Sequence, residues 1–292
     1  MAPSFYNRIL HEETIMKNKA ASCRGARPCA PTSGDLHALH IRSIRSQNPL
    51  LRSPLIEMEQ IAKVFKTITG DFTALKGINA RFYRGEFVSV VGKSGSGKST
   101  LVNMLTGIDH PTSGKVRVDG VEIHHMGESD MAAWRGLNLG VVFQFFQLLP
   151  TLTLLENILL PMDFTGKVLS EEREERAMDL LKLVGLHELA DKIPAELSGG
   201  QQQSAAIARA LANDPPIIIA DEPTGNLDSR TAVTVFEFFA GLVQSGKTII
   251  MVTHDPSLAQ RTTRTILLKD GEIVDEIIRT PIPVTKGGGS HA

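Results

Sequence analysis

The chain has 292 residues, of which 42% are hydrophobic and 22% charged, and its 31 basic side chains nearly balance its 32 acidic ones. This composition excludes a collagen-like, a disulfide-rich and a wholly disordered protein, and the length suits about one or two globular domains. No apolar run reaches the roughly 18 to 20 residues that span a bilayer, and the first residues lack the hydrophobic segment of a signal peptide. Cys23 and Cys29 have no second Cys or His pair at zinc-site spacing, so we expect free thiols in a reducing cytoplasm.

The near-zero net charge hides a basic N-terminal region. Residues 1–55 carry eight Lys and Arg side chains against three acidic ones, a balance of +5, which leaves −6 for the rest of the chain. Because the segment is rich in Ser, Pro, Ala and Arg and lacks apolar periodicity, we expect a disordered extension over residues 1–54. Two alternatives are a transit peptide and a membrane-surface helix around Leu36, Leu39 and Ile44. At the other end, the Gly-rich residues 281–292 predict a flexible tail.

An ordered domain is expected over residues 55–280, and its first part is rich in β-strand formers. Runs at 55–65, 80–92 and 115–123 alternate with turn residues, and Asp119-Gly120 is a dipeptide typical of tight hairpins. These runs predict an antiparallel β layer.

The second part alternates between helical and buried-strand patterns. Residues 170–186 place apolar side chains on one helical face, with Ser170 expected as the N-cap and Gly185 as the end; these side chains are Ala177, Leu180, Leu181 and Val184. The continuous apolar runs at 216–221 and 247–255 are typical of parallel strands buried on both faces. A hairpin at 265–277, turning at Asp270-Gly271, closes the domain. The alternation predicts an α/β core.

A buried strand, a glycine-rich loop and a helix follow one another over residues 87–105. The loop matches GxxxxGK[ST] in the strand–loop–helix setting that this motif requires. Its main-chain N–H groups and the positive helix end can face the β- and γ-phosphates of a nucleotide, Lys98 adds a charge, and Ser99 offers a hydroxyl to Mg²⁺. The predicted phosphate site consists of Gly92, Lys93, Ser94, Gly95, Ser96, Gly97, Lys98, Ser99 and Thr100.

Two adjacent carboxylates, Asp221 and Glu222, end a later buried strand, where ligands of open α/β sheets gather. Asp221 can hold Mg²⁺ through water, and Glu222 can act as the general base that polarises an attacking water. The alternative is a solvated strand end, but the phosphate loop upstream favours the functional interpretation. The 123 residues that separate Lys98 from Asp221 leave room for an inserted subdomain.

The run Leu197-Ser198-Gly199-Gly200-Gln201 matches the signature segment of ABC-type ATPases and precedes the Asp-Glu strand as in that family. Over residues 55–278 the chain therefore resembles an ABC transporter nucleotide-binding subunit. The resemblance implies a P-loop NTPase fold, in which a RecA-like α/β core carries an antiparallel β subdomain and an α-helical signature subdomain inserted at about 145–200. It also implies ATP and Mg²⁺ as cofactors and ATP hydrolysis as the activity.

The resemblance assigns roles to four further positions. Gln144 is similar to the Q-loop glutamine that touches Mg²⁺ and senses the transmembrane partner, and Asp228 to the D-loop aspartate. His254 resembles the switch histidine at the γ-phosphate, although a lone His after a strand is more often structural. Phe65 stands where the family usually has a Tyr that stacks on adenine; its alternative is core packing.

The signature residues Ser198, Gly199, Gly200 and Gln201 begin a helix, whose positive end can meet a phosphate. In the family, that phosphate belongs to the partner subunit. One departure is Ser204, because the family usually has Arg there. The change removes a charge from the signature helix and leaves the predicted MgATP site intact.

Three segments, 141–161, 194–203 and 220–228, resemble the ATPase subunits of lipoprotein-release, macrolide-export and FtsE-like cell-division systems. The resemblance implies an ATP-dependent homodimer at the cytoplasmic face of the membrane, which drives a separate transmembrane permease through a docking groove at 144–161. The alternatives are an FtsE-like regulatory scaffold and, less favoured, a non-transport ABC protein, since the chain has one cassette and no heptad array. No nucleic-acid partner is expected, and a GTPase is disfavoured because the NKxD motif is absent.

Overall fold

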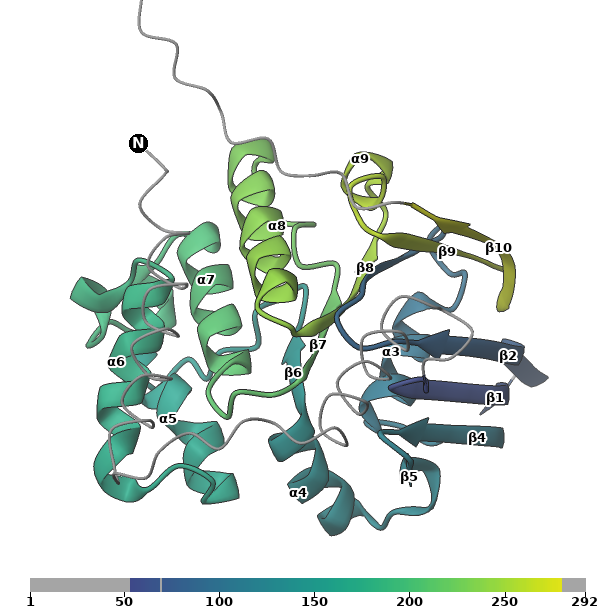
Figure 1. Cartoon of the computed structure of the whole chain (residues 1–292), viewed down its shortest axis with the longest axis horizontal. Helices are drawn as coiled ribbons and strands as arrows, with labels where there is room; N and C mark the ends of the chain where they lie inside the picture. Colours follow the sequence, from purple (N-terminus) through teal and green to yellow (C-terminus); the bar gives the residue numbers. More distant parts are fainter. Residues whose placement is uncertain (1–52, 69, 280–292) are drawn as a thin grey trace, which may run out of the picture. The chain divides into compact units, whose positions relative to one another are not determined.

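The computed structural model describes residues 53–68 and 70–279, which form two β-sheets and the helices that pack on them (Figure 1). The predicted N-terminal extension, its two alternatives, both cysteines and the C-terminal tail lie outside the described residues. The boundaries of those segments therefore stay predictions.

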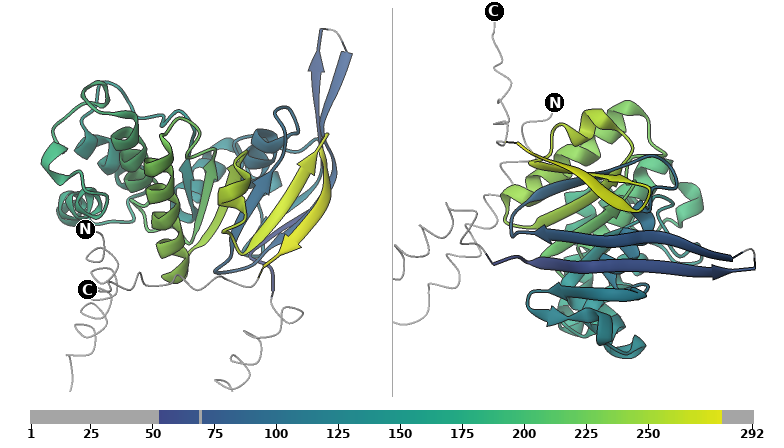
Figure 2. Two further views of the ribbon diagram at one scale, coloured as in Figure 1. Left: turned by 90° about the horizontal axis from the view of Figure 1, so that it is seen from above. Right: turned by 90° about the vertical axis from the view of Figure 1, so that its right-hand side faces the viewer.

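The first sheet is antiparallel and has the order β2-β1-β4-β5. Its strands are β1 (Ile56–Thr67), β2 (Gly70–Phe82), β4 (Ser113–Val118) and β5 (Val121–Glu122). Both views of Figure 2 show the long β1 and β2 strands extending beyond the neighbouring elements. Asp119 and Gly120 have φ values of 50° and 80° between β4 and β5, as a type I′ hairpin requires. The antiparallel layer predicted from the sequence is confirmed for the runs 55–65 and 115–123, whereas residues 87–91 of the run 80–92 form β3 of the second sheet.

The second sheet has six strands in the order β10-β9-β3-β8-β7-β6, and all of them except β10 are parallel. The strands are β3 (Phe87–Val91), β6 (Leu139–Val142), β7 (Ile217–Asp221), β8 (Thr248–Thr253), β9 (Arg264–Lys269) and β10 (Glu272–Ile278). Because β3, β8 and β7 are parallel neighbours, the segments that follow them emerge at one edge of the sheet. The predicted hairpin at Asp270-Gly271 joins β9 to β10.

Seven helices and four 3₁₀ turns complete the described chain. The helices are α3 (Lys98–Thr106), α4 (Glu128–Asn138), α5 (Leu154–Thr165), α6 (Arg173–Leu183), α7 (Gly199–Ala210), α8 (Ser229–Gln244) and α9 (Pro256–Ala259). The 3₁₀ turns are η2 (Ile123–His125), η3 (Ser170–Glu172), η4 (His187–Leu189) and η5 (Pro194–Glu196). Helices α5, α6 and α7 pack on one another between β6 and β7 in the sequence, which is where an inserted helical subdomain was expected (Figure 1).

The helix predicted at 170–186 is present, but its start differs. Ser170–Glu172 form the 3₁₀ turn η3, closed by the Glu172 N–H on the Leu169 carbonyl, and α6 begins only at Arg173. The prediction that Ser170 is the N-cap was therefore wrong, since the 3₁₀ turn occupies the residues that would form the first α-helical turn. The apolar face and the end near Gly185, whose φ is 77°, agree with the prediction.

The parallel sheet separates two hydrophobic cores. Alternate side chains of a strand point to opposite faces, so Val88 and Val90 pack with α3 and the antiparallel sheet, whereas Phe87 packs with α8. The second core continues into the buried faces of α5, α6 and α7. Strand β3, which leads into the loop before α3, is thus packed on both faces.

Candidate active site

The phosphate loop predicted from the sequence lies between β3 and α3, and its lysine faces inward. Lys98 is 7% exposed, and its Nζ donates to the main-chain oxygens of Gly92 (3.0 Å) and Lys93 (3.1 Å). The ammonium group is therefore held inside the loop by its own backbone. The exposed residues Lys93, Ser94 and Gly95 form the outer part of the loop.

Two glycines let the loop pack closely on neighbouring strands. A Cβ at Gly92 would lie 2.3 Å from the Leu268 carbonyl oxygen of β9. Gly97, with a φ of 101°, caps α3, and a Cβ there would lie 2.7 Å from the Ala74 oxygen of β2. Both sheets therefore fix the position of the loop, and no other residue fits these two positions without a shift of the backbone.

Asp221 ends β7 and faces Ser99 at the start of α3. Burial raises the pKa of its carboxyl and the charge of Glu222 adds to this, whereas a hydrogen bond from Ser99 and the charge of Lys98 act in the opposite direction. Its Oδ1 is buried without a hydrogen-bond partner. A buried, unpaired carboxylate oxygen beside a hydroxyl fits a hard cation such as Mg²⁺, which binds oxygen ligands.

Glu222, the next residue, lies between two of the other predicted site residues. Its Oε2 is 3.2 Å from His254 Nδ1, and its Oε1 is 3.9 Å from Lys98 Nζ. The backbone of Glu222 is in the left-handed region, with a φ of 47°, and its N–H donates to the Val252 oxygen of β8. A non-glycine residue in this region is strained, and such strain concentrates at functional sites. A cavity of about 310 Å³ opens beside Glu222 and His254.

Gln144 follows β6 and lies at the same edge of the six-stranded sheet as Glu222 and His254. Its main-chain oxygen accepts from Asn226 Nδ2 (3.0 Å), and a Cβ at Gly225 would lie 3.2 Å from its Nε2. Gln144 therefore lies against the loop that follows Glu222. Four predicted residues from four strand ends thus gather in one place: Lys98, Gln144, Glu222 and His254.

Arg209 in α7 is a residue that the sequence patterns did not reveal. Its guanidinium donates to the main-chain oxygens of Gln147 (2.6 Å) and Phe146 (2.9 Å), just after Gln144. Phe146 and Gln147 both have left-handed backbones, with φ values of 55° and 51°. Burial lowers the pKa of Arg209. This arginine links the signature helix to the segment that carries Gln144.

The signature segment forms the start of helix α7. Ser198 is the N-cap of α7 and forms a capping box with Gln201, and a Cβ at Gly200 would lie 2.9 Å from Thr231. Asp228 is the N-cap of α8, where hydrogen bonds from Thr231 and Arg230 lower the pKa of its carboxyl. Across residues 53–68 and 70–279, no hydrogen bond or ion pair joins 197–201 to the phosphate loop.

Phe65 lies near the end of β1, and its ring is 38% exposed. Lys63 Nζ lies 5.0 Å from the ring centroid. Lys63 pairs in register with Leu75, whose side chain lies near Gly97, and Phe65 follows Lys63 by two residues in β1. The ring is therefore accessible to a ligand, on a strand whose neighbour β2 contacts the phosphate loop. Ser204 is half-buried in α7.

Comparison with known proteins identifies the family. Residues 75–225 match the ABC transporter family model. The lipoprotein-releasing system ATP-binding protein LolD of Aquifex aeolicus is 46% identical over 225 residues, covering 77% of this chain and 98% of LolD. The macrolide export ATP-binding/permease protein MacB of Syntrophobacter fumaroxidans is 46% identical over 224 residues, which cover 76% of this chain and 31% of that longer protein.

A solved structure shares the fold. The dimeric structure of a post-hydrolysis state of the ATP-binding cassette MJ0796 of Methanocaldococcus jannaschii, bound to ADP and Pi, gives a TM-score of 0.73 at 42% identity, covering 78% of this chain and 100% of that one. The predicted fold, an α/β P-loop NTPase with an antiparallel β subdomain and an inserted helical subdomain, is confirmed. The chain therefore belongs to the ABC transporter family, as an ATP-binding subunit that hydrolyses ATP with Mg²⁺.

Proposed function

We propose that two copies of this chain close on two MgATP molecules and that this closure drives a separate transmembrane permease. The observation that carries the proposal is the separation of the phosphate loop from the signature segment, which share no hydrogen bond or ion pair in the described part of the chain. A second copy would supply the missing signature residues to each phosphate loop. The dimeric structures of MJ0796 support this assembly.

The phosphates would be held by the loop residues 92–100. Nucleotide binding would turn the Lys98 ammonium group from the main-chain oxygens of Gly92 and Lys93 to the phosphate oxygens. Ser99, Asp221 and Gln144 would hold Mg²⁺, which when bound neutralises charge on the phosphate oxygens. The unpaired Oδ1 of Asp221 favours this assignment. Phe65 would stack on the adenine.

Hydrolysis would start at Glu222, which accepts a proton from the attacking water as the new P–O bond forms and the bond to the leaving ADP oxygen breaks. His254, 3.2 Å from this carboxylate, would position it and contact the γ-phosphate. Lys98 would stabilise the charge that develops on the transferring group. From the second copy, residues 198–201 would present a helix start to the same phosphate, with Asp228 beside it.

The permease would dock on the segment 144–161 at the cytoplasmic face of the membrane. Phe145 is 72% exposed and Leu149 is 42% exposed, so this segment offers two large apolar side chains to a partner. The described residues include no helix that is long and apolar enough to cross a bilayer. The similarity to LolD and MacB favours a partner of the lipoprotein-release or macrolide-export type, moved by ATP-driven closure.

The Glu222→Gln variant tests the dimer. The substitution keeps the size of the side chain but removes the base, so we expect hydrolysis to fall at least about a hundredfold and an ATP-bound dimer to accumulate. Size-exclusion chromatography with light scattering measures the mass with and without MgATP. Glu188→Gln, at an exposed glutamate, is the control. A variant that stays monomeric at saturating MgATP would contradict the proposed assembly.

A further inference from the structure

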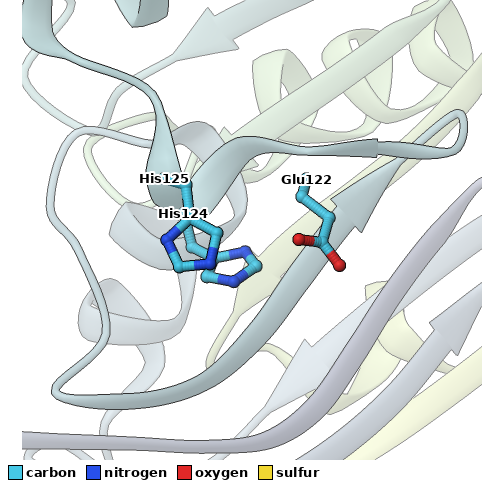
Figure 3. A group of neighbouring side chains, drawn as sticks. All are labelled: Glu122, His124 and His125. Atoms are coloured by element: carbon cyan, nitrogen blue, oxygen red, sulfur yellow. The ribbon is translucent and has the colours of Figure 1, made fainter.

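A cluster of potential metal ligands lies outside the nucleotide site. Glu122 ends β5, and His124 and His125 follow directly in η2 (Figure 3). One ligand atom from each side chain lies within 4.8 Å of the other two, and the two imidazole centroids are 4.0 Å apart. We propose that Glu122, His124 and His125 bind a divalent transition metal of the zinc type at a site separate from that of the nucleotide.

The carboxylate of Glu122 is ready to bind a cation. Its Oε1 accepts a hydrogen bond from Arg117 Nε (3.1 Å), which holds the carboxylate beside the two histidines. Arg117 also reaches Glu57 (3.3 Å) and Glu59 (3.3 Å). If Glu122 rotates to bind a metal, Arg117 still pairs with Glu57 and Glu59. The guanidinium charge is therefore not left unpaired.

The backbone of β4 orients His124. The Val116 N–H donates to its Nδ1 (3.2 Å), and the main-chain oxygen of Val116 lies at the same distance from that nitrogen. Histidines that bind metals commonly donate their second ring N–H to a carbonyl or carboxylate, which fixes the ring and the tautomer. Metal binding at Nε2 would require the tautomer in which Nδ1–H donates to the Val116 oxygen, in place of the bond from the Val116 N–H. His125 is exposed and lies against the His124 ring.

Ligand chemistry selects the metal. Two imidazoles and one carboxylate suit Zn²⁺ and its neighbours, whereas Mg²⁺ prefers oxygen ligands. In a tetrahedral zinc site with bonds near 2.0–2.1 Å, the ligand atoms stand roughly 3.3 Å apart. Side-chain rotation would have to close the present separations by about 1.5 Å at most. The fourth position would hold water, because three protein ligands leave it open.

Zinc binding by the full-length protein tests the site. Isothermal titration with ZnCl₂ in excess Mg²⁺ should show one more Zn²⁺ per chain in the wild type than in the His124→Ala/His125→Ala variant, and Glu122→Gln should weaken this binding about tenfold or more. The control is His110→Ala/His187→Ala, which removes two other imidazoles, one half-buried and one exposed. Equal stoichiometry and affinity in the wild type and the double variant would overturn the proposal.

Cobalt distinguishes this cluster from the N-terminal cysteines. In a Cys23→Ser/Cys29→Ser background, bound Co²⁺ should give the visible absorption of a four-coordinate ion without thiolate charge transfer, saturating at one equivalent. The absorption should disappear on adding His124→Ala/His125→Ala, while circular dichroism and basal ATPase stay at wild-type values. If the absorption requires the cysteines, or survives loss of both histidines, the assignment is wrong.

Discussion

Asp221 carries a charge that its surroundings disfavour. Burial raises the pKa of its carboxyl, so between the ordinary and the raised value the folded protein binds a proton that the unfolded chain has released. The free energy of unfolding of the nucleotide-free protein therefore falls as the pH rises through this interval. At neutral pH the full cost of the buried charge is present, and a bound cation would offset it.

We predict opposite effects of Asp221→Asn with and without ligand. In the nucleotide-free protein the variant should have a higher melting temperature than the wild type at pH 7, because no charge is buried. The decrease in melting temperature between pH 4 and 7 should also be smaller in the variant than in the wild type. The Mg²⁺-dependent part of the stabilisation by ATP should be lost; a ligand at 100 times its Kd adds about 2.7 kcal/mol in total. Thermal unfolding measures both, with Asp179→Asn, at an exposed aspartate, as the control. A lower melting temperature without nucleotide would contradict the argument.

At the scale of elements, α7 and the segment after β6 are joined by Arg209. The carbonyl oxygens of Phe146 and Gln147, two residues with left-handed backbones, both accept hydrogen bonds from one guanidinium. The forked shape of this group lets it donate to both oxygens at once. A lysine is a point donor and cannot do this. The geometry of this segment therefore depends on the shape of the arginine head as well as on its charge.

We expect Arg209→Lys to lower the free energy of unfolding by about 0.5–1.5 kcal/mol, since one of the two carbonyl oxygens, which are only partly buried or exposed, loses its hydrogen bond. ATP affinity should change little, because the phosphate loop is untouched, whereas ATPase activity should fall as Gln144 loses its support. Hydrogen exchange over 143–149 should become faster. Arg176→Lys is the matched control, because Arg176 also donates to two main-chain oxygens, those of Leu211 and Ala212. Equal effects of both variants on ATPase activity would contradict a specific role for Arg209.

The same elements show what the sequence could predict. The phosphate loop, the two hairpin turns and the buried strands depend on neighbouring residues, so local patterns were sufficient for them. The meeting of Glu222 and His254 follows from strands that end at one edge of a parallel sheet. The contact of Arg209 with Phe146 spans 63 residues and leaves no pattern in the chain. The start of α6 was misplaced because the choice between a 3₁₀ and an α-helical first turn involves small energy differences.

At the scale of the whole molecule, the proposed assembly makes each chain half of two sites. A chain with a damaged phosphate loop would still offer an intact signature segment to its partner, and the reverse would hold for a chain with a damaged signature segment. A C₂ dimer presents the same two surfaces from both copies, so each composite site draws one part from each copy. Two inactive variants should then repair one another when mixed.

We predict this repair for Lys98→Ala and Ser198→Arg. Each variant alone should lose at least about a hundredfold in ATPase activity, since every site lacks one part. In an equal mixture, half of the dimers combine the two variants and one of their two sites is intact, so about a quarter of the wild-type activity should return if the sites act independently. Mixing Lys98→Ala with the variant that carries both substitutions leaves no intact site and is the control. If both variants are folded by circular dichroism but their mixture regains no activity, the prediction of independent sites, each built from two copies, is wrong.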